Sequence, residues 1–91
     1  MKYLICYDIS DDKCRRKVVK YLESLAYRIQ YSVFRANCTR EQLNKIKNRL
    51  VSLSEGYDDV IITIIPICAS CEAGTWQYGQ PLEERQQCII I

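Results

Sequence analysis

Apolar residues recur along this chain with two different periods, and the period changes from one segment to the next. Residues 2–9, KYLICYDI, are apolar on both faces and rich in aromatic and β-branched side chains. This pattern predicts a buried central strand. Because side chains alternate along a strand, Asp8 is expected on one face and Tyr7 on the other.

The following segment has the spacing of a helix. Ser10, Asp11 and Asp12 supply N-cap candidates and negative charge for a helix start, which is a more probable role for Asp11 and Asp12 than metal ligation. A buried stripe is then predicted at Cys14, Val18, Leu22 and Leu25. The helix is expected over about residues 12–25, with a basic ridge on its other side formed by Lys13, Arg16 and Lys20.

Three further elements follow. Residues 27–36, YRIQYSVFRA, are strand-like, and the polar Gln30 and Ser32 suggest two short strands around a bend. Thr39 and Gln42 have the spacing of a capping box, which predicts a second helix that continues to about residue 53 and ends near Gly56. Residues 60–67, VIITIIPI, read as a buried strand that closes at its proline.

The predicted order is βαββαβ, which is that of the ferredoxin-like α+β fold with helices on one face of a sheet. We expect one domain over residues 1–91, with its core in 1–67 and an irregular segment after it. The apolar ending, residues 88–91, is expected to pair with a sheet edge, in this subunit or in a second one.

Charge is distributed unevenly along the chain. Residues 1–50 hold 12 Lys/Arg and 5 Asp/Glu, a net charge of +7, whereas residues 51–91 hold 1 and 6, a net charge of −5. A basic half suits a polyanion such as nucleic acid, although a solvated surface with a chance bias would look the same. No apolar run reaches the ~20 residues of a membrane span, and the early Asp8 interrupts any signal peptide, so we expect a cytoplasmic protein without membrane contact.

Cysteine and histidine usage limits the chemistry. Six cysteines without a secretory signal favour reduced thiols. Cys68 and Cys71 form the one CxxC pair, which follows a predicted strand, so we interpret it as a structural turn. The chain contains no histidine. Any hydrolysis would therefore depend on carboxylates with a hard, oxygen-ligated metal.

Asp8 is the first candidate for such chemistry, because it stands where the central strand meets a loop. The alternative is a carboxylate that caps the next helix or pairs with an arginine. A second group of candidates combines cations with aromatic rings, which suits phosphate contact and base stacking but also fits a solvated helix face and a core. For Tyr31 we favour the core. This second group comprises Arg15, Arg16, Lys17, Lys20, Tyr27, Arg28, Tyr31, Phe34 and Arg35.

Taken together, the motifs YDISDD (7–12), RRKV (15–18), RIQYSVF (28–34) and the proline-containing strand end IPIC (65–68) closely resemble the CRISPR-associated Cas-two family. The resemblance covers essentially the whole chain. It departs modestly at Cys14, which interrupts a run that is often longer in Arg/Lys, and at Ala26, where many relatives have glycine.

The resemblance implies a symmetric homodimer in which the C-terminal strand joins the partner's sheet. It assigns a Mg²⁺ ligand and catalytic role to Asp8 and a further catalytic role to Tyr7. It also places Arg15, Lys17, Arg28 and Phe34 where the family's other site residues are assigned. Together with the basic ridge and the group of cations and rings, this predicts a nucleic-acid surface that includes Lys13, Arg15, Arg16, Lys17, Lys20, Arg28, Phe34 and Arg35.

Two functions then compete. One is a scaffold that holds spacer DNA for the Cas-one integrase, and the other is a metal-dependent endonuclease on single-stranded RNA or double-stranded DNA. We favour the scaffold, with cleavage as a further activity. A stand-alone, toxin-like endoribonuclease of the same fold is the alternative.

Overall fold

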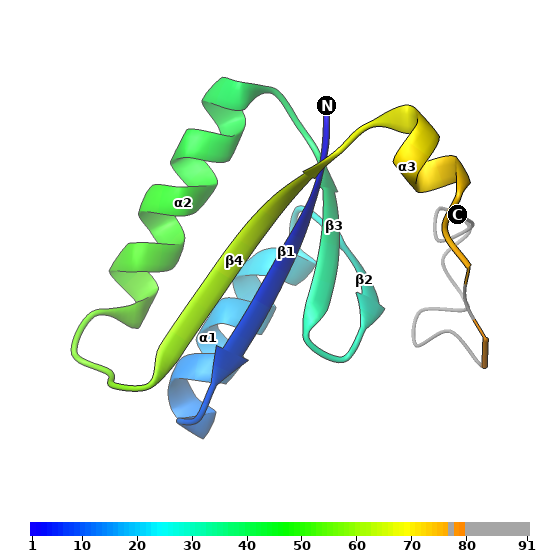
Figure 1. The fold of residues 1–91 in the computed structure, drawn as a ribbon. Helices are drawn as coiled ribbons and strands as arrows, with labels where there is room; N and C mark the ends of the chain where they lie inside the picture. Colours follow the sequence, from blue (N-terminus) through cyan, green and yellow to red (C-terminus); the bar gives the residue numbers. More distant parts are fainter. Residues whose placement is uncertain (77, 80–91) are drawn as a thin grey trace.

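The computed structural model describes residues 1–76, 78 and 79. Within them the predicted order of strands and helices is present (Figure 1). The elements are β1 (Lys2–Ile9), α1 (Asp12–Glu23), β2 (Tyr27–Gln30), β3 (Val33–Asn37), α2 (Arg40–Ser54), β4 (Val60–Ile67) and α3 (Ala69–Ala73).

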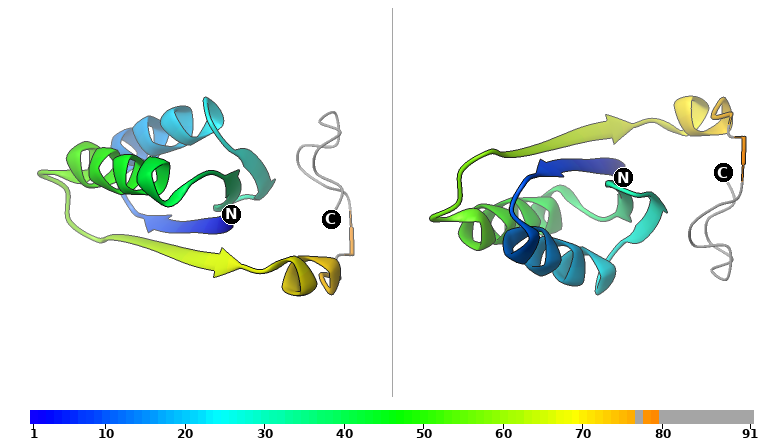
Figure 2. Two further views of the ribbon diagram at one scale, coloured as in Figure 1. Left: turned by 90° about the horizontal axis from the view of Figure 1, so that it is seen from above. Right: turned by 90° about the horizontal axis from the view of Figure 1, so that it is seen from below.

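The strands form one antiparallel sheet in the order β2-β3-β1-β4. The first strand is therefore internal, as its two apolar faces predicted. Helices α1 and α2 lie on the same side of the sheet (Figure 2). This arrangement confirms the ferredoxin-like α+β fold.

The core lies between the sheet and these two helices. Its most deeply buried side chains are Phe34, Ile5, Leu22, Leu50, Val18 and Cys14. Alternate residues of β1 enter this core, while Leu4, Cys6 and Asp8 are on the other side. We call that other side the open face, since no helix covers it among the described residues. In β4 it carries Ile61, Thr63 and Ile65, which lie across from Asp8, Cys6 and Leu4.

The first helix begins as predicted and ends earlier. Asp11 is its N-cap, and the Asp11 carboxylate accepts a hydrogen bond from the Cys14 amide at 2.9 Å. The stripe of Cys14, Val18 and Leu22 is buried, but Leu25 is exposed, contrary to the sequence prediction. The helix ends at Glu23, so Leu25 lies beyond the last turn and no longer follows its periodicity.

The second helix has the predicted termini. The Gln42 amide donates to the Thr39 hydroxyl at 3.1 Å, and the Thr39 amide donates to the Gln42 side chain at 2.9 Å, which completes a capping box. After the helix Gly56 has a φ of 85°, a left-handed conformation that glycine adopts without strain.

The chain after β4 was expected to be irregular, and for residues 69–73 this is wrong, because they form the short helix α3. The expected C-terminal strand at residues 88–91 lies outside the described residues. In the part of the chain that the structure describes, no helix has the length and apolar character to span a bilayer.

Candidate nucleic-acid interface

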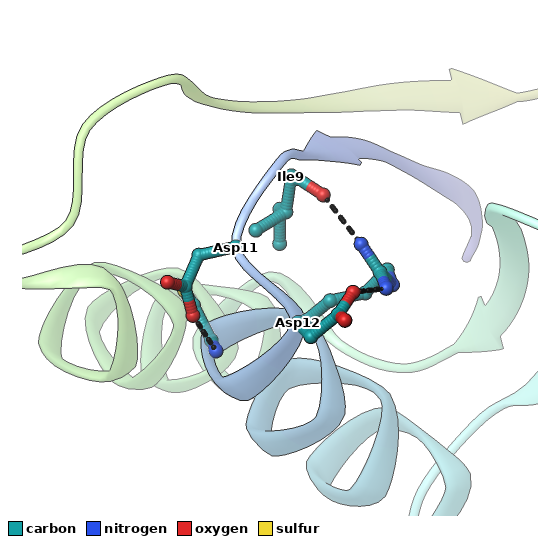
Figure 3. Close-up of polar contacts among 5 residues, drawn as sticks. Ile9, Asp11 and Asp12 are labelled. Atoms are coloured by element: carbon teal, nitrogen blue, oxygen red, sulfur yellow. Dashed lines mark hydrogen bonds and ion pairs between the residues drawn. The ribbon is translucent and has the colours of Figure 1, made fainter.

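Arg15 is held in place at the start of α1 by Ile9 and Asp12, both of which are labelled in Figure 3. Its guanidinium donates to the carbonyl oxygen of Ile9 at 2.9 Å and pairs with the Asp12 carboxylate. These contacts tie the end of β1 to the first turn of α1. The side chain remains 40% exposed, so it can still contact an anion from outside.

A cavity of about 920 Å³ opens between α1 and the turn that joins β2 to β3. We call it the α1–β2 cavity. Its cations are Arg15, Arg16 and Lys20 of α1 and Arg28 of β2. The remainder of its lining comprises Tyr7, Val19, Glu23, Tyr31 and Ser32. Cations around partly aromatic walls suit a nucleotide, which presents a charged phosphate and a flat base.

Arg28 and Tyr7 form the inner wall of this cavity. The Tyr7 hydroxyl donates to the Tyr31 carbonyl oxygen at 2.9 Å and accepts from the Arg28 guanidinium at 3.2 Å. The Arg28 guanidinium also lies 5.3 Å from the ring centroid of Phe34 and 5.9 Å from that of Tyr31. Its Nε is buried and has no hydrogen-bond partner among the described residues. Tyr7 therefore orients a guanidinium that retains donor capacity.

Two aromatic residues have positions that differ from their expected roles. Phe34 has an exposed fraction of 0%, so its ring cannot stack on a base in this structure and acts as a core residue beneath Arg28. Tyr31, expected in the core, is 78% exposed. It lies in the turn between β2 and β3, where strand alternation no longer determines the direction of a side chain.

The remaining cations of α1 extend beyond the cavity. Lys17 donates to the Tyr57 hydroxyl at 3.3 Å, and its ammonium lies 5.4 Å from the centre of that ring. Tyr57, between α2 and β4, thus fixes the direction of Lys17, and no sequence motif predicts this pairing. Lys13, Arg16 and Lys20 are exposed, as expected of the basic ridge.

Asp8 lies apart from these cations of α1. It is exposed on the open face near the end of β1, whereas Tyr7 is buried on the helix side. Arg35 of β3 shares the open face, because it pairs with Leu4 in the sheet. The alternative roles for Asp8 were to cap the next helix or to pair with an arginine. In the structure Asp11 caps α1 and Arg15 pairs with Asp12, so other carboxylates fill both roles there.

The fit of a metal at Asp8 depends on groups from outside this chain. Among the described residues no three Asp, Glu, Cys or His side chains come together as potential ligands. Mg²⁺ is commonly held by one or two carboxylates together with waters and substrate phosphates. The Asp8 carboxylate fits such a site as one ligand and does not form a cage by itself.

The fold and the site define a small ferredoxin-like protein with a cationic helix beside an aromatic cavity and a separate carboxylate on its open face. The sequence model described as CRISPR associated protein Cas2 matches residues 1–74. The chain belongs to this family, the Cas-two family that its motifs resemble.

Curated relatives agree with this assignment. A CRISPR-associated endoribonuclease Cas2 of Rhodospirillum rubrum is 39% identical over 83 residues, which is 91% of this chain and 66% of that protein. A second, from Chloroflexus aurantiacus, is 35% identical with full coverage of both chains. The chain spans just under two thirds of the Rhodospirillum rubrum relative.

Solved structures share the fold. Cas2 of Streptococcus pyogenes, crystallised at pH 6.5, superposes with a TM-score of 0.74 at 25% identity, over 87% of this chain and 100% of that one. A protein of Thermus thermophilus described as hypothetical superposes with a TM-score of 0.75 at 27% identity, over 88% and 92% of the two chains.

Proposed function

We propose that this chain acts in CRISPR adaptation as a homodimeric scaffold that holds spacer DNA for the Cas-one integrase. The observation that supports this most directly is the grouping of Arg15, Arg16, Lys20 and Arg28 around the α1–β2 cavity, with Lys13 and Lys17 exposed on the same helix. Phosphate contacts of this kind position a duplex without reading its sequence.

The separation of the cations from Asp8 also favours a scaffold. In one chain the cavity is on the helix side of the sheet and the carboxylate is on the open face. A phosphate in the cavity is therefore not presented to the Asp8 carboxylate of the same chain. Binding by this surface can proceed without hydrolysis.

The homodimer is supported by the composition of the open face. Ile61 and Ile65 are 62% and 45% exposed, and Leu4 is half-buried beside them. Exposed aliphatic side chains on the sheet face of a chain of 91 residues suit an interface with a second copy, because small domains bury little surface alone. Pairing of two open faces would also bring two copies of Asp8 toward each other.

Cleavage is proposed as a further activity of that paired arrangement. Two Asp8 carboxylates with a phosphate group could hold a divalent cation, for which we propose Mg²⁺. The substrate would be single-stranded RNA or double-stranded DNA. The relatives named as endoribonucleases support the RNA substrate.

The test uses Asp8→Asn, with Asp58→Asn as a matched control because Asp58 is also an exposed carboxylate. Each variant is assayed for metal-dependent cleavage of both substrates and for spacer acquisition in cells. The scaffold role predicts that Asp8→Asn acquires spacers normally, whatever its cleavage activity. Loss of acquisition in a folded Asp8→Asn dimer that still binds the integrase would overturn it.

A stand-alone, toxin-like endoribonuclease is the second candidate, and the word endoribonuclease in the names of the relatives supports its activity but not its independence from CRISPR. It predicts growth arrest when the chain is produced without any integrase, and relief of that arrest by Asp8→Asn. A genome in which integrase genes and a CRISPR array adjoin the gene for this chain would count against it.

A further inference from the structure

Cys68 and Cys71 form a close thiol pair immediately after β4. Their sulfur atoms are 3.1 Å apart, and both side chains are exposed. A disulfide requires a sulfur–sulfur separation of about 2.05 Å, so closure needs a movement of only about 1 Å. The spacing of three residues within one short turn makes that movement local.

The surroundings of Cys68 favour its thiolate. The backbone amide of Cys71 donates to the Cys68 sulfur at 3.4 Å, and the Ser70 hydroxyl lies 3.2 Å from the same sulfur. The hydrogen bond with Ser70, followed by those from Cys71, lowers the pKa of Cys68 to about 7. The neighbouring Cys68 raises the pKa of Cys71. The two thiols thus have different roles in any exchange reaction.

We propose that Cys68 and Cys71 are a redox-active dithiol site that reacts with low-molecular-weight disulfides such as oxidised glutathione. The Cys68 thiolate attacks one sulfur of the small disulfide, which forms a mixed disulfide and releases one small thiolate. Cys71 then loses its proton to solvent, and its sulfur attacks the Cys68 sulfur. The protein disulfide forms, a second small thiolate leaves, and the small disulfide has been reduced to two thiols.

The other described cysteines lack this arrangement. Cys14 is fully buried, and Cys6 and Cys38 are partly buried, whereas Cys68 and Cys71 are both exposed. A structural zinc site, the usual alternative for a CxxC pair, needs four ligands. No third potential ligand joins the pair among the described residues, so the geometry favours redox chemistry.

The pair was interpreted as a structural turn because it follows a strand, whereas a reactive CxxC usually opens a helix. In the structure Cys68 directly precedes α3, and its sulfur accepts a hydrogen bond from the Cys71 amide as an N-cap side chain would. Oxidation would covalently close this turn at the point where the chain leaves the sheet. The site is independent of the proposed nucleic-acid surface.

The experiment treats the full chain with oxidised glutathione at pH 7 and follows it by intact mass and peptide mapping. The wild type should lose two hydrogens and protect Cys68 and Cys71 from iodoacetamide until dithiothreitol is added. Cys71→Ser should instead accumulate a stable glutathione adduct on Cys68. Cys38→Ser is the matched control and should behave as the wild type.

The rate provides a second measurement. The Ser70 hydroxyl is the largest cause of the lowered pKa of Cys68, and Cys71→Ser retains it. Cys68 of Cys71→Ser should therefore react several-fold faster at pH 7 than Cys71 of Cys68→Ser, since the larger thiolate fraction outweighs the weaker nucleophilicity that a lower pKa brings. Equal rates at the two positions, or a wild-type protein that retains glutathione without closing its disulfide, would overturn the proposal.

Discussion

Tyr7 and Asp8 are consecutive residues whose side chains lie on opposite faces of the sheet. The Tyr7 hydroxyl contacts the Tyr31 carbonyl and Arg28 on the helix side, and Asp8 is exposed on the open face. The two residues were both assigned to catalysis from the family resemblance. Within one chain the two side chains do not face the same space, and we propose that Tyr7 positions Arg28.

Tyr7→Phe tests that positioning role. The variant loses the hydrogen bond to Tyr31 and leaves Arg28 with one partner fewer, so the free energy of unfolding should fall by about 1 kcal/mol. Affinity for nucleic acid should fall as well, because the guanidinium is no longer oriented. Urea denaturation measures the first effect and filter binding the second. Tyr57→Phe removes a hydroxyl that accepts from the exposed Lys17, so it should change stability by less than about 0.5 kcal/mol.

The α1 cations should determine the salt dependence of duplex binding. Removing one phosphate contact from B-DNA reduces the slope of log K against log salt by about 0.9. Arg16→Ala and Lys20→Ala should each do so, whereas Lys45→Ala on the exposed side of α2 should leave the slope unchanged. Titrations at several salt concentrations measure it. Equal slopes for all three variants would remove α1 from the interface.

Phe34 and Tyr31 should respond in opposite ways to substitution. Phe34 is fully buried, so Phe34→Leu should lower the free energy of unfolding by about 1–3 kcal/mol. Tyr31 is exposed at the cavity, so Tyr31→Ala should leave stability nearly unchanged and weaken single-stranded RNA binding by about 1–3 kcal/mol for one lost stack. Thermal unfolding and fluorescence anisotropy distinguish them. A stable Phe34→Leu protein with weakened RNA binding would contradict this division.

Most of the fold could be predicted because its signals are local. The alternation in β1 placed Tyr7 and Asp8 correctly, and the Thr39–Gln42 capping box and Gly56 marked the ends of α2. One error concerns β4, which was predicted to be buried but is an edge strand with alternate residues exposed, because its apolar run does not show which strands flank it. The other errors lie where a local rule was extended past the end of an element. Leu25 follows the last turn of α1, and Tyr31 lies in a turn, so neither keeps the periodicity of its neighbours.

The site was less predictable because it depends on contacts between distant segments. The α1–β2 cavity joins Arg16 and Lys20 to Arg28, and only the packing of α1 beside β2 brings them together. Likewise the contact between Arg15 and the Ile9 carbonyl, and the capping of α3 by a sulfur atom, have no sequence motif. The sequence identified most of the cations but not their arrangement.

The open face should control self-association. Ile61→Lys places a charge on an apolar surface that we propose is buried between two copies, so the dimer should weaken by at least tenfold, about 1.4 kcal/mol. Val51→Lys is the matched control, because Val51 is a 66% exposed aliphatic residue on α2, in the other layer. Sedimentation equilibrium measures both. A dimer unaffected by Ile61→Lys would place the interface elsewhere.

Asp8 should make that association depend on divalent cations. If two open faces pair, two like carboxylates approach each other, and at about 4 Å in water their repulsion costs about 1 kcal/mol. A cation held between them would offset this cost. In the presence of EDTA, Asp8→Asn should therefore dimerise about fivefold more tightly than the wild type.

Mg²⁺ should strengthen the wild-type dimer and leave the Asp8→Asn dimer unchanged. Asp58→Asn is the control, because it removes an exposed carboxylate in the loop before β4, and it should follow the wild type in both conditions. Sedimentation equilibrium with and without Mg²⁺ measures the two effects separately. If Mg²⁺ strengthens the wild type and Asp8→Asn equally, the cation acts at another site and the two carboxylates do not meet.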